Sequence, residues 1–182
     1  MTPCRAGRAL SDAALAALLL LLLPSAGWAG AVRSAVRVTQ SGDRTVLNLH
    51  GGHPRAKLVL PAEEGIYPRS LDATRIVAEE PGRLLIIVSD YASRPNGPTH
   101  QCGAGTETVV RVIALLPVAH QTLARRIASC WSTIEDGEVA WNGATGLLTL
   151  RWVIYDPEMR SVQVSYKVSA NGEVALLEPL PR

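Results

Sequence analysis

The last third of the chain alternates between apolar and polar side chains, and this alternation constrains the fold more than any other feature. Positions 162, 164, 166 and 168 are Val, Val, Tyr and Val, and the positions between them are polar. A period of two places the apolar side chains on one face of a strand. A segment with apolar residues at the alternate positions 148, 150, 152 and 154 precedes this strand across Asp156-Pro157, and Asn171-Gly172 turns the chain toward residues 173–177. The pattern predicts an antiparallel meander.

Short strands separated by turn-forming residues are predicted over most of the remaining chain. Ser41-Gly42-Asp43 and Pro81-Gly82 are turn sequences between apolar or alternating runs. Two Pro- and Gly-rich stretches, 61–73 and 92–105, are expected to be exposed loops and candidate binding surfaces. The predicted strands cover residues 32–40, 45–50, 57–60, 75–79, 83–89 and 106–116. Such a series predicts a single mainly β domain, either an antiparallel β-sandwich or a barrel-like sheet.

Two segments bear on the interior of this domain. The run Leu84-Leu85-Ile86-Ile87-Val88 has no polar face, so we expect it to form a central strand that is covered on both sides. Residues 121–134 are ambiguous, because Leu123, Ile127 and Trp131 share one face either on a helix or on a strand. One short helix near 121–134 therefore stands as an alternative to a strand.

The N-terminus has the features of a cleavable signal peptide. Arg5 and Arg8 precede an apolar run at 13–23, and Pro24 leads to small residues that end at Ala29. The apolar run has about 11 residues, whereas a membrane-spanning helix needs about 20. We therefore expect residues 1–29 to be removed and residues 30–182 to be exported as one β-rich domain. The expected location is the periplasm or the medium, without a stable membrane span.

The charge balance of the exported domain argues against nucleic-acid binding. Removal of Arg5, Arg8 and Asp12 leaves 16 basic and 15 acidic residues, a net charge of +1. Proteins that bind nucleic acid through its phosphates carry a basic patch or a basic excess. The chain also has no Phe, so the core is expected to be aliphatic and to recruit most of the mature tryptophans. These are Trp131, Trp141 and Trp152.

Two cysteines remain after cleavage, Cys102 and Cys130, and an exported chain meets an oxidising compartment. We expect a disulfide between them. It closes a separation of 28 positions, which contributes roughly 3.5 kcal/mol in the chain-entropy model. The alternative is a nucleophilic Cys102 beside His100 on one side of an extended segment. A thiol held in a disulfide cannot attack a substrate, so the disulfide is the favoured interpretation.

No cluster of residue types in the exported domain requires a metal, a cofactor or a catalytic site. His50 and His53 flank two glycines, and His100 or His120 is a conceivable third ligand, but two imidazoles alone predict surface histidines. The acidic pairs at 63–64, 79–80 and 135–136 adjoin turns or loops. No nucleophile-elbow, phosphate-loop or dinucleotide motif occurs in the sequence. We therefore predict neither a metal nor a cofactor.

Arg125 and Arg126 are close to Arg111 in the sequence and form a candidate cationic patch for an anionic partner. We expect these arginines to belong to a solvated face. The three mature tryptophans are likewise candidates for a sugar or peptide groove, although the core is the expected place for most of them.

The sequence favours a small non-enzymatic binding protein whose loops or sheet edge contact an envelope protein, a cell-wall component or a small ligand. One alternative is a hydrolase assembled from distant loops, with Asp90, His100, Glu107 and Asp156 as donors. Another is a structural subunit that adds strands to an envelope assembly. An enzyme requires a concave site with convergent polar groups, whereas a binding module requires an exposed patch or a ligand pocket.

Overall fold

The structure is a computed structural model that describes residues 36–42, 44–50, 56–95, 105–155 and 157–177. The chain divides into two compact units, Met1–Arg33 and Ser34–Arg182, and all described residues belong to the second. The predicted signal peptide, residues 1–29, lies outside the described residues, so its removal stays a prediction. The described ranges include no helix that is long and apolar enough to cross a membrane.

The described residues confirm the mainly β, antiparallel fold. They form eleven strands and no helix. The strands are β1 (Val36–Ser41), β2 (Arg44–Leu49), β3 (Ala56–Val59), β4 (Ile66–Glu80), β5 (Leu84–Ser93), β6 (Thr106–Ala114), β7 (His120–Ser129), β8 (Ile134–Asn142), β9 (Leu147–Tyr155), β10 (Met159–Val168) and β11 (Val174–Leu177).

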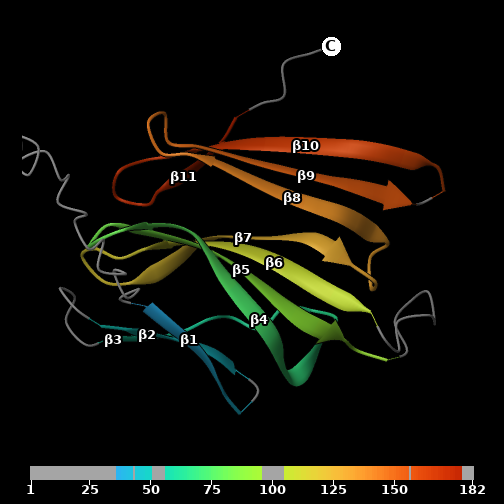
Figure 1. The fold of residues 1–182 in the computed structure, drawn as a ribbon, viewed down its shortest axis with the longest axis horizontal. Helices are drawn as coiled ribbons and strands as arrows, with labels where there is room; N and C mark the ends of the chain where they lie inside the picture. Colours follow the sequence, from blue (N-terminus) through green and yellow to red (C-terminus); the bar gives the residue numbers. More distant parts are fainter. Residues whose placement is uncertain (1–35, 43, 51–55, 96–104, 156, 178–182) are drawn as a thin grey trace, which may run out of the picture. The chain divides into compact units, whose positions relative to one another are not determined.

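The strands form two sheets in which every neighbouring pair is antiparallel (Figure 1). The smaller sheet has the order β1-β2-β3, and the larger one runs through eight strands from β11 to β4 in chain order. The larger sheet does not return to its first strand, so it is not closed. Within it, β9, β10 and β11 form the antiparallel meander that the alternation predicts, with Leu150 opposite Val164.

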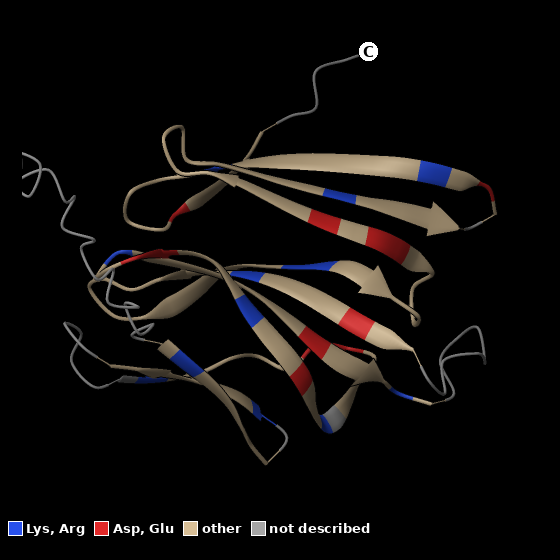
Figure 2. Ribbon diagram, viewed as in Figure 1, with Lys and Arg blue, Asp and Glu red and all other residues tan. Residues whose placement is uncertain are grey.

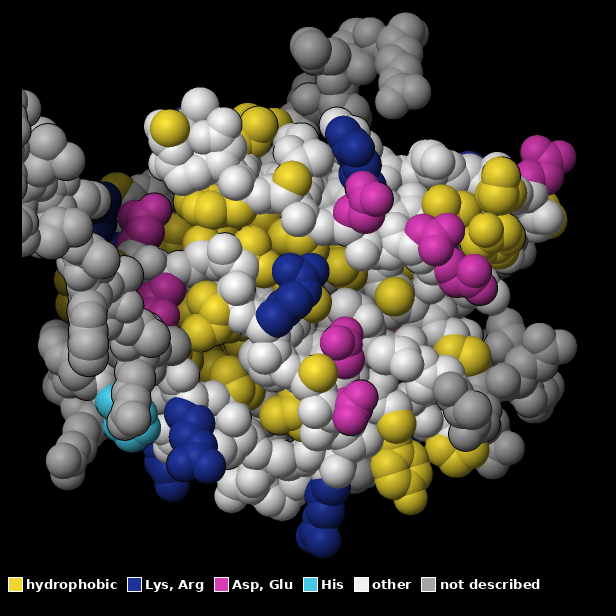
Figure 3. Space-filling model, in the orientation of Figure 1, with side chains coloured by type: hydrophobic (Ala, Val, Ile, Leu, Met, Phe, Trp, Pro, Cys, Tyr) yellow, Lys and Arg dark blue, Asp and Glu magenta, His cyan; other side chains and the backbone are white. Residues whose placement is uncertain are grey.

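Two hydrophobic cores lie on opposite faces of β5 and β6. The first core joins these strands to β9 and β10, and the second joins them to β1 and β2. Figure 1 accordingly shows β4–β7 between β1–β3 on one side and β8–β11 on the other. Hydrophobic side chains are also visible at the surface between the β4–β7 and β8–β11 layers (Figure 3), as expected where a sheet remains open.

Strand β5 confirms the prediction of a central strand. Its side chains from Leu84 to Ser89 are all buried. Leu84, Ile86 and Val88 belong to the first core, whereas the two residues between them, Leu85 and Ile87, belong to the second. Because both faces are covered, the strand needs apolar side chains at consecutive positions and not only at alternate ones.

The short helix proposed as an alternative for residues 121–134 is wrong. This segment is strand β7, followed by a turn at 130–133 and by the first residue of β8. Strand β7 pairs with β6 from Ser129 to His120, and this pairing satisfies backbone groups that a helix would have bonded internally. The register shifts after Thr108 and after Val112. These two irregularities disturb the alternation and explain why helix and strand looked equally good in the sequence.

Strand β4 is longer than its sequence suggests. Residues 61–73 were expected to be a loop, but only residues 61–65 of this range lie outside a strand, because β4 begins at Ile66. The pairing of β4 with β5 contains register shifts between Ile66 and Leu71 and between Leu71 and Ala73. Because β4 is an edge strand, these shifts accommodate a segment that contains a proline. Most of the second predicted loop, 96–104, lies outside the described residues.

The tryptophans follow the expectation that most join the core. Trp152 is buried in the first core, and Trp141 packs against it. Trp131 is half-buried over Gly65, where an added Cβ would come within 2.8 Å of the Trp131 Cγ. Gly65 has a φ of +79°, so this close approach and the backbone conformation both favour glycine.

Candidate functional site

A cavity of about 110 Å³ lies where the β1–β3 sheet meets β5 and β6. Its walls come from β1, β2, β4, β5 and β6 and from residues 60–63 between β3 and β4. It therefore includes part of the 61–73 segment that the sequence marks as a candidate binding surface. We call this cavity the Arg111 pocket, after the charged side chain at its inner end.

Arg111 is a charged residue that is only 1% exposed. On β6 its side chain points to the same face as Ile113, a member of the second core, while Val110 and Val112 point into the first. Both faces of β6 are covered, so the alternation of the strand carries the guanidinium into the interior. Burying a charge without compensation is costly, and its partners therefore decide what Arg111 does.

The guanidinium of Arg111 is only partly satisfied by the protein. Its Nη1 donates to the hydroxyl of Tyr91 at 3.1 Å, and its central carbon lies 5.5 Å from the centroid of the Tyr91 ring. Its Nη2 is 3.9 Å from Oε1 of Glu63, which is too far for a hydrogen bond. The buried Nε has no hydrogen-bond partner among the described residues. The described groups of the protein therefore leave this buried cation incompletely satisfied.

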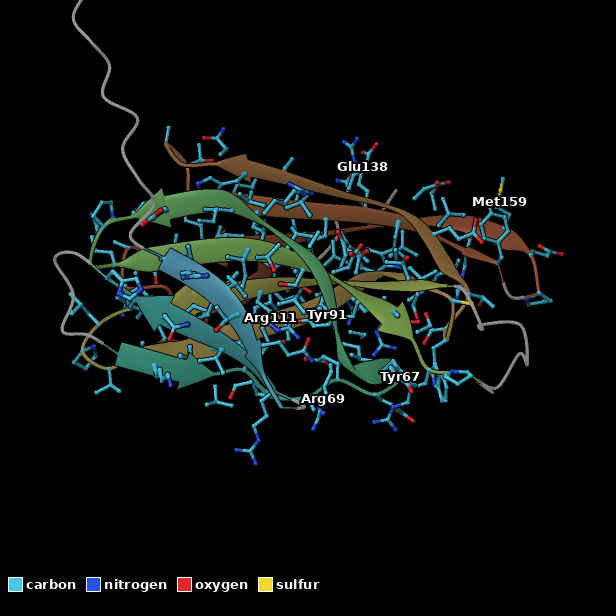
Figure 4. The ribbon with its side chains drawn as sticks, turned by 60° about the horizontal axis from the view of Figure 1, so that its bottom comes forward. Tyr67, Arg69, Tyr91, Arg111, Glu138 and Met159 are labelled. Carbon is cyan, nitrogen blue, oxygen red and sulfur yellow. The ribbon has the colours of Figure 1, made fainter. Side chains whose placement is uncertain are left out.

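Tyr91 and Thr45 extend the polar wall of the pocket. Tyr91 is 3% exposed, and its hydroxyl lies 3.0 Å from Oγ1 of Thr45, which is also buried. A tyrosine hydroxyl has one hydrogen and two lone pairs, so it can accept from Arg111 and still bond to Thr45. Figure 4 shows Arg111 and Tyr91 side by side, with Tyr67 further toward the edge of the molecule. The contacts hold the inner end of the pocket in one arrangement.

The outer end of the pocket carries a second cation. Arg94 is exposed, and its Nε donates to the carbonyl oxygen of Ile66 at 2.7 Å, which fixes the guanidinium at the rim. Tyr67 is 49% exposed beside it, and the Glu63 side chain is 28% exposed. Two guanidinium groups thus face one carboxylate that is partly solvated. The balance of charge in the pocket is positive, which favours an anionic ligand.

A second buried ion pair lies on the same face of the central strands and has a different character. Glu107 is fully buried, and its Oε1 accepts hydrogen bonds from Ser93 Oγ at 2.6 Å and from the Trp131 amide at 3.0 Å. Its Oε2 lies 3.3 Å from Nε of Arg126, whose Nη2 donates to the carbonyl of Glu64. This network ties β5, β6 and β7 to the turn at 130–133 and to the loop before β4. Glu107 Oε2 and Arg126 Nε have no hydrogen-bond partner among the described residues, but they neutralise each other as an ion pair, so the role of this network is structural.

The four donors of the hydrolase alternative are not brought together where they are described. Asp90 is opposite Thr108, which donates to it at 2.8 Å, whereas Glu107 is opposite Tyr91. Neighbouring positions along a strand point to opposite faces, so Asp90 and Glu107 face different cores. His100 and Asp156 lie outside the described residues.

The histidines and cysteines of the sequence analysis are only partly described. His50 is exposed, and His120 is exposed beside the Val118 carbonyl and 4.0 Å from Glu173, while His53 lies outside the described residues. Within the described ranges no three metal-ligating side chains cluster. Cys102 also lies outside these ranges, so its disulfide with Cys130 stays a prediction.

The arginines at 125 and 126 do not form one solvated face with Arg111, contrary to expectation. Arg126 is opposite Val109 and turns toward Glu107, with 17% of its side chain exposed. Arg125 is opposite Val110 and turns to the other face, where its guanidinium carbon lies 5.0 Å from the Trp152 ring centroid. Proximity in the sequence therefore does not place the three guanidinium groups on one face of the sheet.

Comparisons with known proteins do not supply a family or an activity. No protein-family model matches the chain, and no curated protein or solved structure shows a significant match to it.

Proposed function

We propose that this protein is an exported, non-enzymatic binding protein that recognises the anionic group of a small ligand in the Arg111 pocket. The observation that carries the proposal is the buried Arg111 guanidinium, whose Nε lacks a hydrogen-bond partner among the described residues. A buried polar group without a partner is costly, and a ligand that supplies the missing acceptor recovers that cost. Carboxylate and phosphate oxygens fit a guanidinium best, because they accept charge-assisted hydrogen bonds from it.

The size of the pocket limits what it can hold. Ligand pockets for drug-sized molecules measure roughly 300–1,000 Å³, and an engineered cavity of about 150 Å³ binds benzene. The Arg111 pocket, at about 110 Å³, suits a carboxylate or a phosphate group and not a larger ring system. The rest of a longer ligand would leave past Tyr67 and Arg94 at the rim. These residues would then contact the part of the ligand outside the pocket.

Binding without turnover is favoured by the residues in the pocket. Among the described residues that line it, none is Ser, Cys or His. The one aliphatic hydroxyl among these residues, on Thr45, lies 3.0 Å from Tyr91, and their one carboxylate, Glu63, lies 3.9 Å from the guanidinium of Arg111. Recognition by fixed donors requires none of these groups. We therefore favour a binding protein over the hydrolase alternative.

Export to the periplasm or the medium remains part of the proposal, on the basis of the N-terminal pattern and the cysteines. An added Cβ on Gly105 would lie 2.3 Å from Cβ and 2.7 Å from Sγ of Cys130. Cys102 precedes Gly105 by three positions, and three extended residues span at most about 10 Å. The two sulfurs can therefore meet, and an oxidising compartment would join them. Intact mass and N-terminal sequencing of the protein recovered from the envelope would test both expectations.

The proposal is tested by thermal unfolding and calorimetric titration with four probes: acetate, succinate, inorganic phosphate and sulfate. A ligand at 100 times its Kd stabilises the folded state by about 2.7 kcal/mol. We expect at least one probe to raise the Tm in a saturable manner. Arg111→Lys, which loses the planar fork, and Tyr91→Phe should reduce this rise.

The matched control is Arg75→Lys on β4, because Arg75 is exposed and does not line the pocket. It should leave the response to the probes unchanged. Equal responses of Arg111→Lys and Arg75→Lys, or no response to any probe, would refute the proposed site.

A further inference from the structure

A second concave surface lies beside β7 and is larger than the Arg111 pocket. It has a volume of about 530 Å³ and is bounded by residues 124–126 of β7, by Ile134 and by the facing side chains of β9 and β10. We call it the β7 groove. Glu63 lines both this groove and the Arg111 pocket, but a partner in the groove needs no ligand in the Arg111 pocket.

The groove runs along an edge of β7 that has no partner strand in the described part of the chain. Strand β7 pairs with β6 from Ser129 to His120, but with β8 only through Ser129 and Ile134. Beyond that pair β8 crosses close to Ile127, where an added Cβ on Gly137 would lie 2.4 Å from the Ile127 carbonyl oxygen. At residues 124–126 the edge borders open space instead. Such an edge offers backbone donors and acceptors to an added strand.

The groove combines an apolar floor with guanidinium groups. Trp152 forms the buried part of the floor, and Ile154 and Val162 are half-buried next to it. Arg125 lies over the Trp152 ring, and Arg160 is exposed at the start of β10. Basic segments are accordingly seen on both β7 and β10 in Figure 2. Arg126 also lines the groove, but it is paired with the buried Glu107. Arg125 and Arg160 remain against one carboxylate, Glu63, so the complementary partner is acidic.

We propose that the β7 groove binds an extended acidic segment of a partner protein, which adds to β7 as a further strand. Its backbone would pair with residues 124–126, and one face would carry both apolar and acidic side chains. The apolar ones would cover Trp152 and Ile154, and the acidic ones would reach Arg125 and Arg160. An anionic lipid satisfies the charge of the groove but not the unpaired edge, so the peptide is the favoured occupant.

The test uses the peptide acetyl-Glu-Thr-Val-Thr-Glu-Thr-Val-Thr-amide, labelled for fluorescence anisotropy, with the purified protein. One face of this peptide as a strand carries only Glu and Val. We expect saturable binding below about 1 mM, which corresponds to about −4 kcal/mol. A peptide with Lys in place of Glu should not bind.

Three variants of the protein test the role of the arginines. Arg160→Gln and Arg125→Gln should each weaken binding of the Glu peptide about tenfold, while Arg151→Gln should not change it. Arg151 is an exposed arginine of β9 outside the groove, and Arg160→Gln leaves the Arg125–Trp152 contact intact.

Strand addition is separated from simple charge attraction by two N-methylated isomers of the peptide. Alternate residues of an added strand direct their N–H groups toward β7 or away from it. One isomer is methylated at the odd positions and the other at the even positions. Their affinities for the protein should therefore differ at least tenfold. Equal affinity of the isomers would overturn the proposal. So would equal binding of the Lys peptide, or binding to phosphatidylglycerol vesicles without binding to the Glu peptide.

Discussion

Replacing Arg111 with Met distinguishes between two roles of its guanidinium, ligand binding and stabilisation of the fold. Methionine has a similar length and no charge, and it suits irregular interior spaces. The neighbouring groups tolerate the change. Glu63 is 28% exposed, so water solvates its carboxylate, and Tyr91 keeps its contact with Thr45 at 3.0 Å. No buried charge is left without a partner by this substitution.

The expected change in the free energy of unfolding is the balance between the contacts that Arg111→Met removes and the burial cost that it relieves. The substitution removes one hydrogen bond from a charged donor to Tyr91, about 1.5–3 kcal/mol, and a cation–π contact of about 0.5–2 kcal/mol. It also removes the desolvation cost of a 99% buried cation, which amounts to several kcal/mol, and the unsatisfied Nε, about 1–3 kcal/mol. Replacing buried ion pairs with apolar residues is commonly neutral or stabilising by about 1–4 kcal/mol. We therefore expect Arg111→Met to be as stable as the parent or more stable, by up to about 4 kcal/mol.

The assay is urea unfolding followed by circular dichroism, with the slope of the transition compared between the two proteins. For a domain of this size each kcal/mol raises the Tm by about 2–4 °C. The same variant should lose its response to the anion probes. A decrease in the free energy of unfolding of more than about 2 kcal/mol, which is within the range for loss of the Tyr91 bond without any compensating gain, would refute the reasoning. Arg111 would then be a structural residue.

Three other changes have defined outcomes. Glu107→Gln should lower the free energy of unfolding by about 3 kcal/mol in urea titrations, because it leaves the largely buried Arg126 without its anion; an unchanged midpoint would contradict the structural role. Gly137→Ala should cost about 1–3 kcal/mol, since its Cβ would lie 2.4 Å from a carbonyl oxygen of β7. Gly143→Ala, whose nearest contact is 3.4 Å, should be near neutral in the same assay. Cys130→Ser should lower the stability of unreduced protein by roughly 3.5 kcal/mol, and two free thiols in the unreduced parent would contradict the disulfide.

The strands were predictable wherever burial on one or both faces left a simple pattern. The meander of β9 and β10 buries one face, so the alternation from Leu148 to Val168 is clear. Strand β5 is covered on both sides, and its continuous apolar run indicates this directly. Strand β7 was not predictable with the same clarity, because two register shifts against β6 disturb its period. Local pattern cannot anticipate irregularities that depend on the partner strand.

The candidate site was much less accessible to sequence reasoning than the fold. Arg111 sits among Val110, Val112 and Ile113, and apolar neighbours at both odd and even positions indicate a strand buried on both faces. That signal was present, and it placed the guanidinium in the interior. The sequence does not indicate the partners of Arg111, because Tyr91 is 20 positions from Arg111 and Thr45 is 46 positions from Tyr91. Only the packing of the β1–β3 sheet against β5 and β6 brings these groups together.

The most direct test of the central claim is the ¹H–¹⁵N resonance of the Arg111 side-chain Nε during titration with carboxylates and phosphates. The assignment comes from its absence in Arg111→Met. If the Nε–H faces a ligand site, the resonance should shift in a saturable manner with at least one anion, and Tyr91→Phe should weaken that response. The account would be contradicted if the chemical shift of this resonance did not change with any anion while the resonances of the exposed arginines shifted without saturation.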